Sequence, residues 1–523
     1  MLEVFDIMAF IIRLLVLNSI LRGSLFGGIA GALSAMSYRV DSFGVGVSVA
    51  ALALAFVVYV NLKTVRSKSA LWFLFGLAYY TTSLFWVNGY LAQEYGDASW
   101  IRWGLWPLLV IILSSSFLII PCLLATLTDS RTLVALPFVL VSLDILREHT
   151  VFSFAWLHPG LLLLDVGFSG WLSVIGALGG SFLVYLLASS CAWLISNKSS
   201  RLKSFALFST ILVSLWVGNQ ALLLPQLSEQ SQSNTSVRIL HSNFTGPHKL
   251  SKNDVIERMQ RYVSLSLQAP KADIVVWPES SMSLPYEEIQ PFVKDSLDKL
   301  KQKSVVVVWG GQARNGQHLQ NVIYRSDQPS PIYFKQRLVP FGEYRPAWFI
   351  DWVEQVTLSR GGDIQVASNS IDQHEFGSLR AVLAVCYEAL YSDVFTSKLH
   401  AGNVAFLLSD VEWTDTPWVK QFLLKLSRVR AAEVGKSVVY ATNQGKTSLI
   451  GPDGAVLRQV ENQATQVMDV LVPLNTRQTL YTQYGHQWLL WLSGGVLLLI
   501  HLANRMHPIN TYSLNQKRLF RAQ

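Results

Sequence analysis

Long apolar stretches occur at both ends of the chain and enclose a more polar region. Apolar stretches long enough to cross about 30 Å of hydrocarbon are expected to form membrane-spanning helices. They lie near residues 23–38, 44–62, 70–91, 103–127, 132–148, 169–196, 204–224 and 487–504. The pattern predicts a membrane domain over residues 1–224 with about seven transmembrane helices, a polar domain over 225–486, a last transmembrane helix over 487–504 and a basic tail over 505–523.

The segment over residues 7–21 allows three interpretations: an interfacial helix, an extension of the first span, or a span of its own. It is also apolar, but Arg13 lies inside it and Arg22 follows it directly. We expect this segment not to cross the membrane, because both arginines then stay near the cytoplasmic face. Glu3 and Asp6 stand where a secretory signal has basic residues, and no small-residue cleavage site follows, so a cleaved signal peptide is not expected.

The polar region alternates short strand-like runs with helix-like segments. Runs rich in β-branched residues predict strands over residues 237–241, 274–277, 305–309, 322–324, 381–385, 404–408, 437–441 and 448–450. Apolar residues at helical spacing predict helices over residues 253–267, 289–301 and 418–434. Because the predicted strands are nearly continuous apolar runs, we expect sheets buried on both faces in an α/β layered domain.

The composition is that of a membrane protein. Of the 523 residues, 51% are hydrophobic and 15% are charged, and the mean hydropathy is +0.33, which excludes an ordinary soluble protein. The formal net charge of +8 does not indicate nucleic acid, because the basic residues form short clusters beside the apolar stretches. The lipid bilayer is therefore the expected partner.

The basic clusters also predict an orientation. They follow the second, sixth and last predicted spans and comprise Lys63, Arg66, Lys68, Lys198, Arg201, Lys203, Arg505, Lys517, Arg518 and Arg521. Acidic residues, Glu94 and Asp97, follow the third span. Basic loops favour the cytoplasmic side of a membrane. With seven spans before it, the polar domain would face the exported side, which in a bacterium is the periplasmic face of the cell inner membrane.

Cysteine usage directs attention to one thiol. The chain has three cysteines, of which Cys122 and Cys191 lie in predicted spans and Cys386 lies in the polar domain. Cys386 therefore has no disulfide partner within its domain, although it would face an oxidising compartment. A lone cysteine is most commonly an inert buried residue. Its sequence context must decide how it is interpreted.

Three short stretches of the polar region each pair an apolar run with one reactive side chain. They are IVVWPES at 274–280 with Glu279, YFKQRLVPFGEY at 333–344 with Lys335, and AVLAVCYE at 381–388 with Cys386. A carboxylate at the end of an apolar strand tends to have a raised pKa and suits a general base. It would take the thiol proton, while Lys335 would favour the thiolate and stabilise an oxyanion. Taken singly, each residue is more commonly structural than catalytic.

These three contexts, in this order, resemble the carbon–nitrogen hydrolase (nitrilase) superfamily, whose signature is a Glu, a Lys and a Cys. The flanking spans and further motifs are similar to a membrane-embedded branch, the apolipoprotein N-acyltransferases. The further motifs are FAWLHPG at 154–160, RVRAAEVGKSVVYATNQG at 428–445, PDG at 452–454 and TLYTQYG at 479–485. PDG alone is common, whereas VPFGEY and CYE between apolar spans are specific, and the resemblance covers nearly the whole chain.

The resemblance implies an α-β-β-α layered sandwich inserted into a multi-span α-helical membrane protein. It implies ping-pong transfer of an acyl chain from a membrane phospholipid to a diacylated apolipoprotein, at the N-terminal α-amino group of its diacylglyceryl-cysteine, the last step of lipoprotein maturation. Cys386 would be the nucleophile that carries the thioester, Glu279 the general base and then acid, and Lys335 the oxyanion stabiliser. No cofactor is implied.

Other residues match the family around the site. Glu343 and Glu388 are expected to orient Lys335 or to support the pocket, although each is equally well a plain structural hydrogen-bond partner. The backbone N–H of Tyr387, directly after the nucleophile, is a candidate oxyanion donor.

Two further groups are candidates for contact with lipid. The aromatic residues Trp348, Phe349 and Trp352 would form an apolar substrate-binding lid at the interface, or would equally well pack in the core. The polar residues near the end of the fifth span, Arg147, Glu148 and His158, would shape the path of the lipid, although such charges are more commonly interfacial anchors.

Two segments depart from the family's pattern. The family usually has Gln-Gly-Asn or Gln-Gly-Asp followed by a Trp, where this chain has different residues from His241 to Leu250. It usually has Asn-Asp-x-Trp-Phe after the strand that follows the cysteine, where this chain has Ser-Asp-Val-Glu-Trp from Ser409 to Trp413. Because these segments would line the substrate side, the resemblance leaves donor preference and acceptor recognition open.

Two alternative functions also stay open. A membrane-tethered amidase or nitrilase would keep Glu279, Lys335 and Cys386 but would use water as the acceptor. A non-catalytic pseudoenzyme would only bind lipidated proteins, which the three intact residues disfavour. The histidines are scattered and no glycine-rich phosphate loop follows a strand, so no metal or nucleotide site is predicted.

Overall fold

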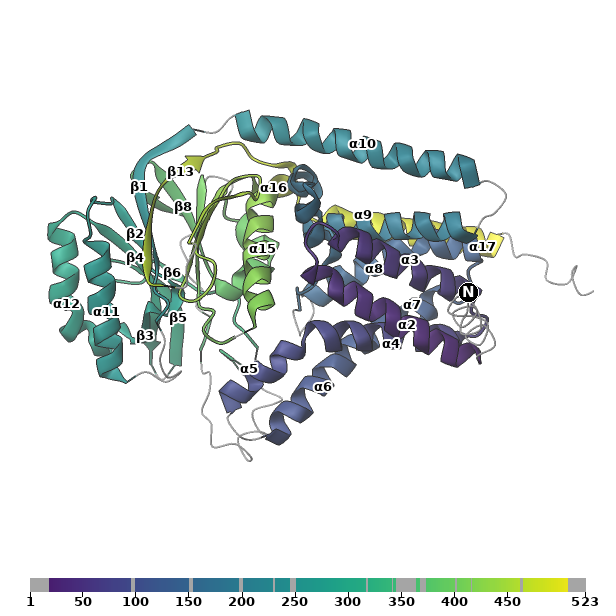
Figure 1. Ribbon diagram of the computed structural model, residues 1–523, viewed down its shortest axis with the longest axis horizontal. Helices are drawn as coiled ribbons and strands as arrows, with labels where there is room; N and C mark the ends of the chain where they lie inside the picture. The colour runs from purple at the N-terminus through teal and green to yellow at the C-terminus, as the bar shows by residue number, and fades with distance from the viewer. Residues whose placement is uncertain are drawn as a thin grey trace, which may run out of the picture.

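A bundle of long helices lies beside a domain of two β-sheets in the computed structural model (Figure 1). The structure describes residues 18–95, 99–149, 154–196, 201–228, 231–244, 251–316, 318–340, 342–344, 364–366, 373–399, 402–414, 416–460 and 464–506. The helices of the bundle are α2 (Ser19–Met36), α3 (Gly44–Asn61), α4 (Val65–Ser83), α5 (Phe85–Tyr95), α6 (Ser99–Ser115), α7 (Ile119–Leu124), α8 (Asp129–His149), α9 (Ser169–Ser196), α10 (Arg201–Ser228) and α17 (Gln487–Met506). Each apolar stretch predicted from the sequence coincides with one or two of these helices.

Five described helical segments are long and apolar enough to cross a membrane. They are Ser19–Arg39, Gly44–Asn61, Arg102–Leu124, Ser169–Ser196 and Gln487–Met506. The axes of α4 and α5 differ by 49°, and the bent pair would together form a sixth span. α8 carries Asp144, Arg147 and Glu148 near its end, and the apolar part of α10 is short, so neither adds to this count. The chain has the helices of a multi-span membrane protein, and the number of eight spans stays a prediction.

α2 packs closely against α4, and the chain bends where α4 ends. A Cβ atom at Gly27 or Gly31 of α2 would lie 2.1 Å from a backbone oxygen of α4, so only glycine permits this approach. After α4 ends, the chain bends at Leu84, and α5 and α6 form an arm that reaches the β-sheet domain (Figure 1).

The polar domain contains two sheets. The first has the strand order β13-β1-β2-β4-β5-β6 with β3 paired to β4, and the second has the order β12-β11-β10-β9-β8-β7. The first comprises β1 (Ser231–His241), β2 (Ile274–Val276), β3 (Met282–Pro285), β4 (Val306–Asn315), β5 (His318–Arg325), β6 (Tyr333–Phe334) and β13 (Gln466–Leu474). The second comprises β7 (His374–Phe376), β8 (Leu379–Val385), β9 (Val404–Ser409), β10 (Ser437–Thr442), β11 (Ser448–Ile450) and β12 (Val456–Gln459).

Alternate residues of the central strands face different layers. In β9, Val404, Phe406 and Leu408 pack between the two sheets, whereas Ala405 and Leu407 pack toward the helical bundle. Helices α11 (Lys252–Ser266) and α12 (Tyr286–Gln302) cover the outer face of the first sheet, and α15 (Pro417–Val434) covers the second (Figure 1). This α-β-β-α sandwich, attached to the helical bundle, confirms the predicted fold class.

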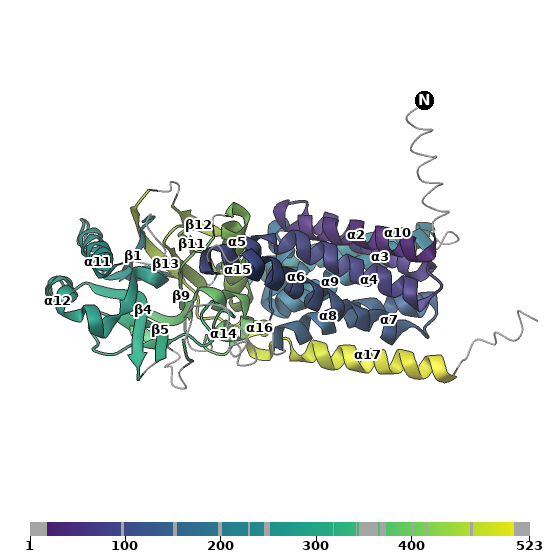
Figure 2. The ribbon, with the colours of Figure 1, turned by 90° about the horizontal axis from the view of Figure 1, so that it is seen from below.

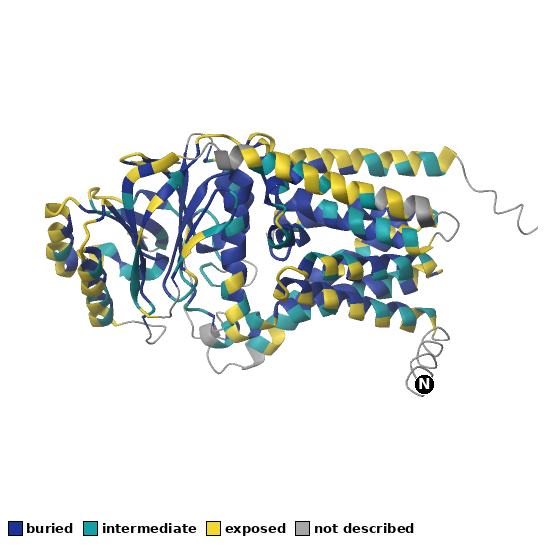
Figure 3. Cartoon of the chain, turned by 45° about the horizontal axis from the view of Figure 1, so that its top comes forward, coloured by how far each residue is buried: buried dark blue, intermediate teal, exposed yellow. Residues whose placement is uncertain are grey.

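The sandwich and the bundle share one apolar core. A single cluster of buried side chains extends from α9 through Phe422 and Leu426 of α15 to the outer face of the second sheet. Figure 3 shows the buried surface of α15 and the exposed outer faces of α10 and α17. α17 runs along the outside of the bundle, beside α8 (Figure 2). The continuous core fixes the ends of the strands relative to the arm formed by α5 and α6.

Candidate active site

Cys386 lies in a sharp turn directly after β8. It opens a short 3₁₀ helix, Cys386–Leu390, and its φ of 45° is in the left-handed region, which is uncommon for a residue other than glycine. Such strain is typical of functional sites. The residue is 8% exposed, and its Sγ donates a hydrogen bond of 3.5 Å to the backbone oxygen of Asp410.

Glu279 lies three residues beyond the end of β2 (Ile274–Val276), and both of its carboxylate oxygens accept hydrogen bonds. Oε1 accepts from Nζ of Lys335 at 3.0 Å and from Nδ2 of Asn321 at 2.8 Å. Oε2 accepts from the backbone N–H of Asp410 at 2.8 Å. β4 passes so close that a Cβ atom at Gly310 would lie 2.1 Å from the backbone oxygen of Glu279. The carboxylate is therefore held in one orientation.

Lys335 follows β6 and lies between two carboxylates. Its Nζ donates to Glu279 at 3.0 Å and to Oε1 of Glu343 at 2.8 Å. The other oxygen of Glu343 accepts from the backbone N–H of Val339 at 2.8 Å, which fixes the loop that carries it. Burial lowers the pKa of Lys335, but Glu279 and Glu343 together raise it well above the ordinary value, so the amine is a cation.

Burial also shifts the pKa values of the nucleophile and the base. It raises the pKa of Glu279, against the opposing charge of Lys335. Burial, followed by the charge of Glu279, raises the pKa of the Cys386 thiol well above its ordinary value, although Lys335 lowers it. Lys335 lowers the pKa of Cys386, as expected from the sequence, but burial and the charge of Glu279 raise that pKa by more. The resting cysteine is a thiol that needs a base.

Glu388 connects the lysine segment with the cysteine turn. Its carboxylate accepts hydrogen bonds from the hydroxyl of Tyr333 at 2.9 Å and from the backbone N–H groups of Gln336 and Val385, both at 2.7 Å. The side chain is fully buried, and burial raises the pKa of its carboxyl group above the usual range. Because β6 and β8 belong to different sheets, Glu388 fixes Cys386 relative to Lys335.

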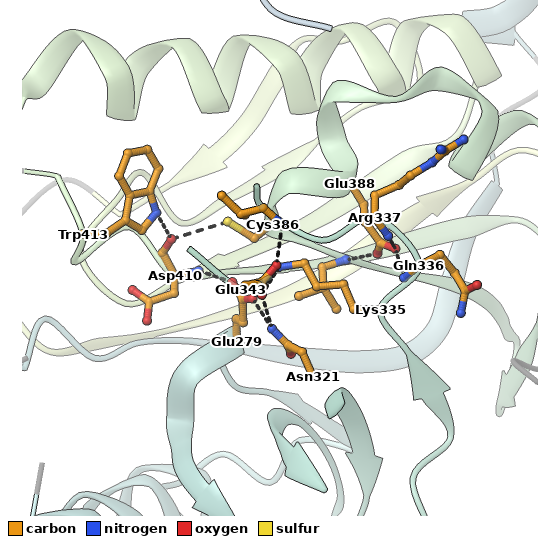
Figure 4. Close-up of polar contacts among 12 residues, drawn as sticks. Glu279, Asn321, Lys335, Gln336, Arg337, Glu343, Cys386, Glu388, Asp410 and Trp413 are labelled. Atoms are coloured by element: carbon orange, nitrogen blue, oxygen red, sulfur yellow. Dashed lines mark hydrogen bonds and ion pairs between the residues drawn. The ribbon is translucent and has the colours of Figure 1, made fainter. Parts of the chain in front are cut away.

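Asp410 connects the base, the nucleophile and an aromatic wall. Its backbone N–H binds Glu279, and its backbone oxygen accepts from both Cys386 and Nε1 of Trp413, the latter at 2.8 Å. Figure 4 shows Cys386 and Trp413 converging on this oxygen. The ring of Trp413 lies 5.2 Å from that of Trp86 on α5. A residue of the membrane bundle thus packs against the support of the nucleophile.

The polar cluster opens into a large apolar cavity. The cavity has a volume of about 740 Å³ and is lined at one end by Glu279, Lys335 and Cys386. Apolar residues of α5 and α6 form the opposite wall: Trp86, Val87, Leu91, Leu105, Leu108, Leu109, Ile112 and Leu113. Leu108 is 48% exposed on the bundle surface, so this wall extends to where lipid would lie. A thiol, a base and a cation at the end of an apolar cavity can perform acyl transfer.

Not all of the predicted site residues can be placed. Trp348, Phe349 and Trp352 lie outside the described residues, as do residues 245–250 of the first divergent segment. The described start of that segment, His241, is buried between the sheets, where Nδ1 lies 3.0 Å from Oγ1 of Thr447. The second divergent segment contributes Asp410 and Trp413 to the cavity wall.

Two residues that bind the catalytic groups were not singled out by the sequence, although Asp410 lies in the second divergent segment. Asn321 donates from Nδ2 to both Glu279 and Glu343, and Asp410 bonds both Glu279 and Cys386. The one sequence signal for Asn321 is its position directly before the apolar run over residues 322–324. Asp410 acts through its backbone, which no side-chain pattern reveals. Across the described residues, no group of three or more His, Cys, Asp or Glu side chains is arranged to hold a metal ion.

The chain is similar to known proteins over most of its length. A model of the apolipoprotein N-acyltransferase N-terminal domain matches residues 30–190, and a model of the carbon-nitrogen hydrolase family matches residues 242–481. The apolipoprotein N-acyltransferase of Haemophilus ducreyi is 25% identical over 80% of this chain and 85% of its own length. That of Pasteurella multocida is 25% identical over 91% and 94%, respectively. An amidase from Nesterenkonia sp. of known structure matches 49% of this chain and 95% of its own, with 15% identity and a TM-score of 0.36.

Proposed function

Because the chain belongs to the apolipoprotein N-acyltransferase family, we propose that it transfers an acyl chain from a membrane phospholipid to the N-terminal α-amino group of a diacylglyceryl-cysteine lipoprotein. The protein is an acyltransferase, and the acyl chain would be carried as a thioester on Cys386. Donor and acceptor are both lipids, which agrees with a site that adjoins the helical bundle.

The cavity is the observation that best supports this proposal. Its polar end holds Cys386, Glu279 and Lys335, and its apolar wall of α5 and α6 has the length and chemistry that an acyl chain would bury. A hydrolase that acts on a small amide needs no such wall. This observation favours a lipid donor over the amidase alternative.

In the first half-reaction, Glu279 accepts the thiol proton as Sγ of Cys386 attacks the carbonyl carbon of the phospholipid ester. The ammonium group of Lys335 stabilises the oxyanion of the tetrahedral intermediate. When the intermediate collapses, the carbon–oxygen bond breaks and Glu279 gives its proton to the departing oxygen. The products are a thioester on Cys386 and a lysophospholipid.

In the second half-reaction, the free α-amino group of the lipoprotein attacks the thioester carbonyl carbon. Glu279 accepts a proton from the attacking nitrogen, and Lys335 again stabilises the oxyanion. The carbon–sulfur bond breaks and the sulfur of Cys386 recovers a proton from Glu279. The N-acylated lipoprotein leaves, and the enzyme returns to its thiol state.

Intact-protein mass spectrometry after incubation with phospholipid tests the thioester. We expect the wild type to gain the mass of one acyl chain and Cys386→Ala to gain none. Cys191→Ala is the matched control, because Cys191 lies on α9 and is not among the residues that line the cavity. An unmodified wild type, or an acylated Cys386→Ala variant, would show that the thioester proposal is wrong.

The acceptor is tested by adding a diacylated lipopeptide to the acylated enzyme. A transferase converts the peptide into its N-acylated form and restores the unmodified protein mass. If the acyl group appears as free fatty acid while the peptide stays unchanged, the protein is a hydrolase that uses water.

We also propose that the sandwich faces the periplasm and that the opposite end of the bundle is cytoplasmic. Lys63 follows α3 and Arg505 lies near the end of α17, close to Asn504, whose side chain contacts Arg131 at 2.7 Å. Basic residues thus gather at one end of the bundle. With intact inner membranes, an impermeant thiol reagent should label a cysteine introduced at Lys301, which is exposed on α12, but not one at Arg505. The reverse result would invert the topology.

A further inference from the structure

One cationic residue lies on the arm that forms the apolar wall of the cavity. In the sequence of α5 and α6, Arg102 is the sole lysine or arginine. It precedes Leu105 by three residues and Leu109 by seven, and both leucines line the cavity. Residues at these spacings share one face of an α-helix. Arg102 therefore lies about 4.5 Å along the axis beyond the apolar lining, on the same face.

One donor of the Arg102 guanidinium group has no hydrogen-bond partner among the described residues. This donor, the Nε atom, is buried. The Cζ atom of Arg102 lies 5.2 Å from the ring centre of Trp103, which is 52% exposed. A buried donor left without a partner is costly, and an aromatic residue beside an arginine is typical of the headgroup level of a membrane. Arg102 as a whole is only partly buried, so an anion can reach its side chain although the Nε atom itself is enclosed.

We propose that Arg102 binds the phosphodiester group of the donor, so that the enzyme selects glycerophospholipids over esters that lack a phosphate. This inference rests on the proposed phospholipid donor. The acyl chains of such a lipid would lie along Leu105 and Leu109, and its phosphate would lie one helical turn beyond them. The planar guanidinium group suits phosphate oxygens because it can donate two parallel hydrogen bonds.

Acyl-enzyme formation with two matched donors tests the proposal. The donors are a phospholipid and a diacylglycerol with the same acyl chains, which keeps both esters but lacks the phosphate. For Arg102→Gln we expect about a tenfold higher half-saturating concentration of phospholipid, the scale of one charge-assisted interaction. The maximal rate should stay within about twofold, and the diacylglycerol reaction should not change. Arg102→Lys should recover most of the phospholipid affinity, because it restores the charge.

A binding measurement separates this inference from the proposed chemistry. A diether phospholipid has no ester to cleave, and its binding to the Cys386→Ala protein can be followed by native mass spectrometry. Adding Arg102→Gln should weaken binding of the diether phospholipid but not of the matching dialkylglycerol. If Cys386 never gains an acyl mass, the proposed function fails, whereas this measurement still tests Arg102. An excess of inorganic phosphate should not displace the lipid, and displacement would mean a site for free phosphate instead.

Arg66→Gln is the matched control, because Arg66 is an exposed arginine in the first turn of α4 and does not line the cavity. It should leave both donors unaffected. Two results with the paired donors would also overturn the inference. Equal weakening of both donors by Arg102→Gln would assign Arg102 a packing role, and no change with either donor would make it an interfacial anchor only.

Discussion

Two clusters of buried charged residues differ in their access to the cavity. The catalytic cluster consists of Glu279, Lys335 and Glu343, and all three line the cavity. The junction cluster consists of Asp144, Glu148, His158, Arg430 and Glu433, between the bundle and α15, and none of these is among the described lining residues. Both clusters are largely removed from water, so burial of charge alone does not distinguish a catalytic site from a structural one.

The junction cluster supplies a hydrogen-bond acceptor where a helix of the bundle is interrupted. α9 is interrupted at Gly176, where φ is 65°, and the N–H of Ala177 loses its helical partner. Oε1 of Glu433 accepts from that N–H at 2.7 Å, while Oε2 lies 2.9 Å from Arg430. Burial raises the pKa of Glu433 to about 7, against the opposing charge of Arg430. A raised carboxyl pKa therefore occurs in both clusters, and access to a cavity decides which one can act on a substrate.

The comparison also changes the interpretation of Arg147, Glu148 and His158, which the sequence made candidates for the path of the lipid. In the structure Nε2 of His158 lies 3.5 Å from Glu148, and Arg147 pairs with Asp144. Among the described residues, none of the three lines the cavity that contains Cys386. Glu148 and His158 belong to the junction cluster, and Arg147 pairs with Asp144 of that cluster.

The largest effect is expected from removing the base. Glu279→Gln keeps the size of the side chain but cannot accept the thiol proton, so acyl-enzyme formation should fall about 10³-fold. Stability should fall by about 2 kcal/mol, because the new amide faces a donor in either orientation, but the fold should persist since Lys335 keeps its contact with Glu343. Stopped reactions analysed by intact mass, together with thermal denaturation, measure both. If unfolding of the variant accounted for all of the lost activity, the role of Glu279 would be structural. The two clusters would then not differ in function.

The same carboxylate should set the acid limb of the pH profile. A general base acts when ionised, so the rate of acyl-enzyme formation should fall as pH drops through the pKa of Glu279. Burial raises that pKa above the ordinary 4.5 of a glutamate, so the limb should lie above that pH. An acid limb at or below pH 4.5 in the wild type would contradict this.

Glu388→Gln should show an intermediate, mixed effect. Gln336 and Val385 donate to different oxygens of Glu388, so the amide places a donor against the N–H group of one of them. We expect a loss of about 2 kcal/mol of stability and a roughly tenfold to hundredfold slower acyl-enzyme formation, because Cys386 is no longer fixed relative to Lys335. Denaturation midpoints and single-turnover rates test this. If only stability falls, Glu388 belongs with the structural cluster.

Partly filling the cavity tests whether the reaction of a long-chain donor depends on access to it. Leu109→Trp adds volume to the apolar wall and should slow acylation by a long-chain donor about tenfold, while a short-chain ester reacts nearly as before. Ile111→Trp is the control, because Ile111 is 46% exposed and is not among the residues that line the cavity. Single-turnover rates with matched donors decide the matter. Equal slowing by both substitutions would mean that the effect arises in the bundle and not in the cavity.

The sequence predicts the elements that carry strong local patterns. The eight predicted strands and three predicted helices of the polar domain are confirmed, as is the layered sandwich. The strands without a predicted counterpart are mostly short or at sheet edges: β3, β6, β7, β12 and β13. Their pairing depends on neighbours far away in the chain, which no local pattern encodes.

The candidate site was predictable to the extent that it consists of side chains in distinctive contexts. Glu279, Lys335 and Cys386 each follow an apolar run, and the structure brings the three to one cavity. The backbone of Asp410 and the wall contributed by α5 were not predictable, because both arise from how separate segments pack. The opposing contributions to the pKa of Cys386 also depend on burial, which is a property of the fold.

The smallest effect on activity, and a distinct effect on stability, is expected from Glu433→Gln. In the folded protein the pKa of Glu433 is about 7, above its ordinary 4.5. The folded state therefore binds this proton more tightly than the unfolded state. The resulting stability is present below pH 4.5 and is lost as pH rises through about 7.

The Gln variant cannot titrate, so its melting temperature should fall less than that of the wild type between pH 5 and pH 8. Its acylation rate per folded molecule should stay within about threefold, because Glu433 does not line the cavity. If the melting temperatures of the two proteins changed with pH to the same extent, the assigned pKa would be contradicted. A hundredfold loss of rate without a change in melting temperature would place Glu433 in the catalytic cluster.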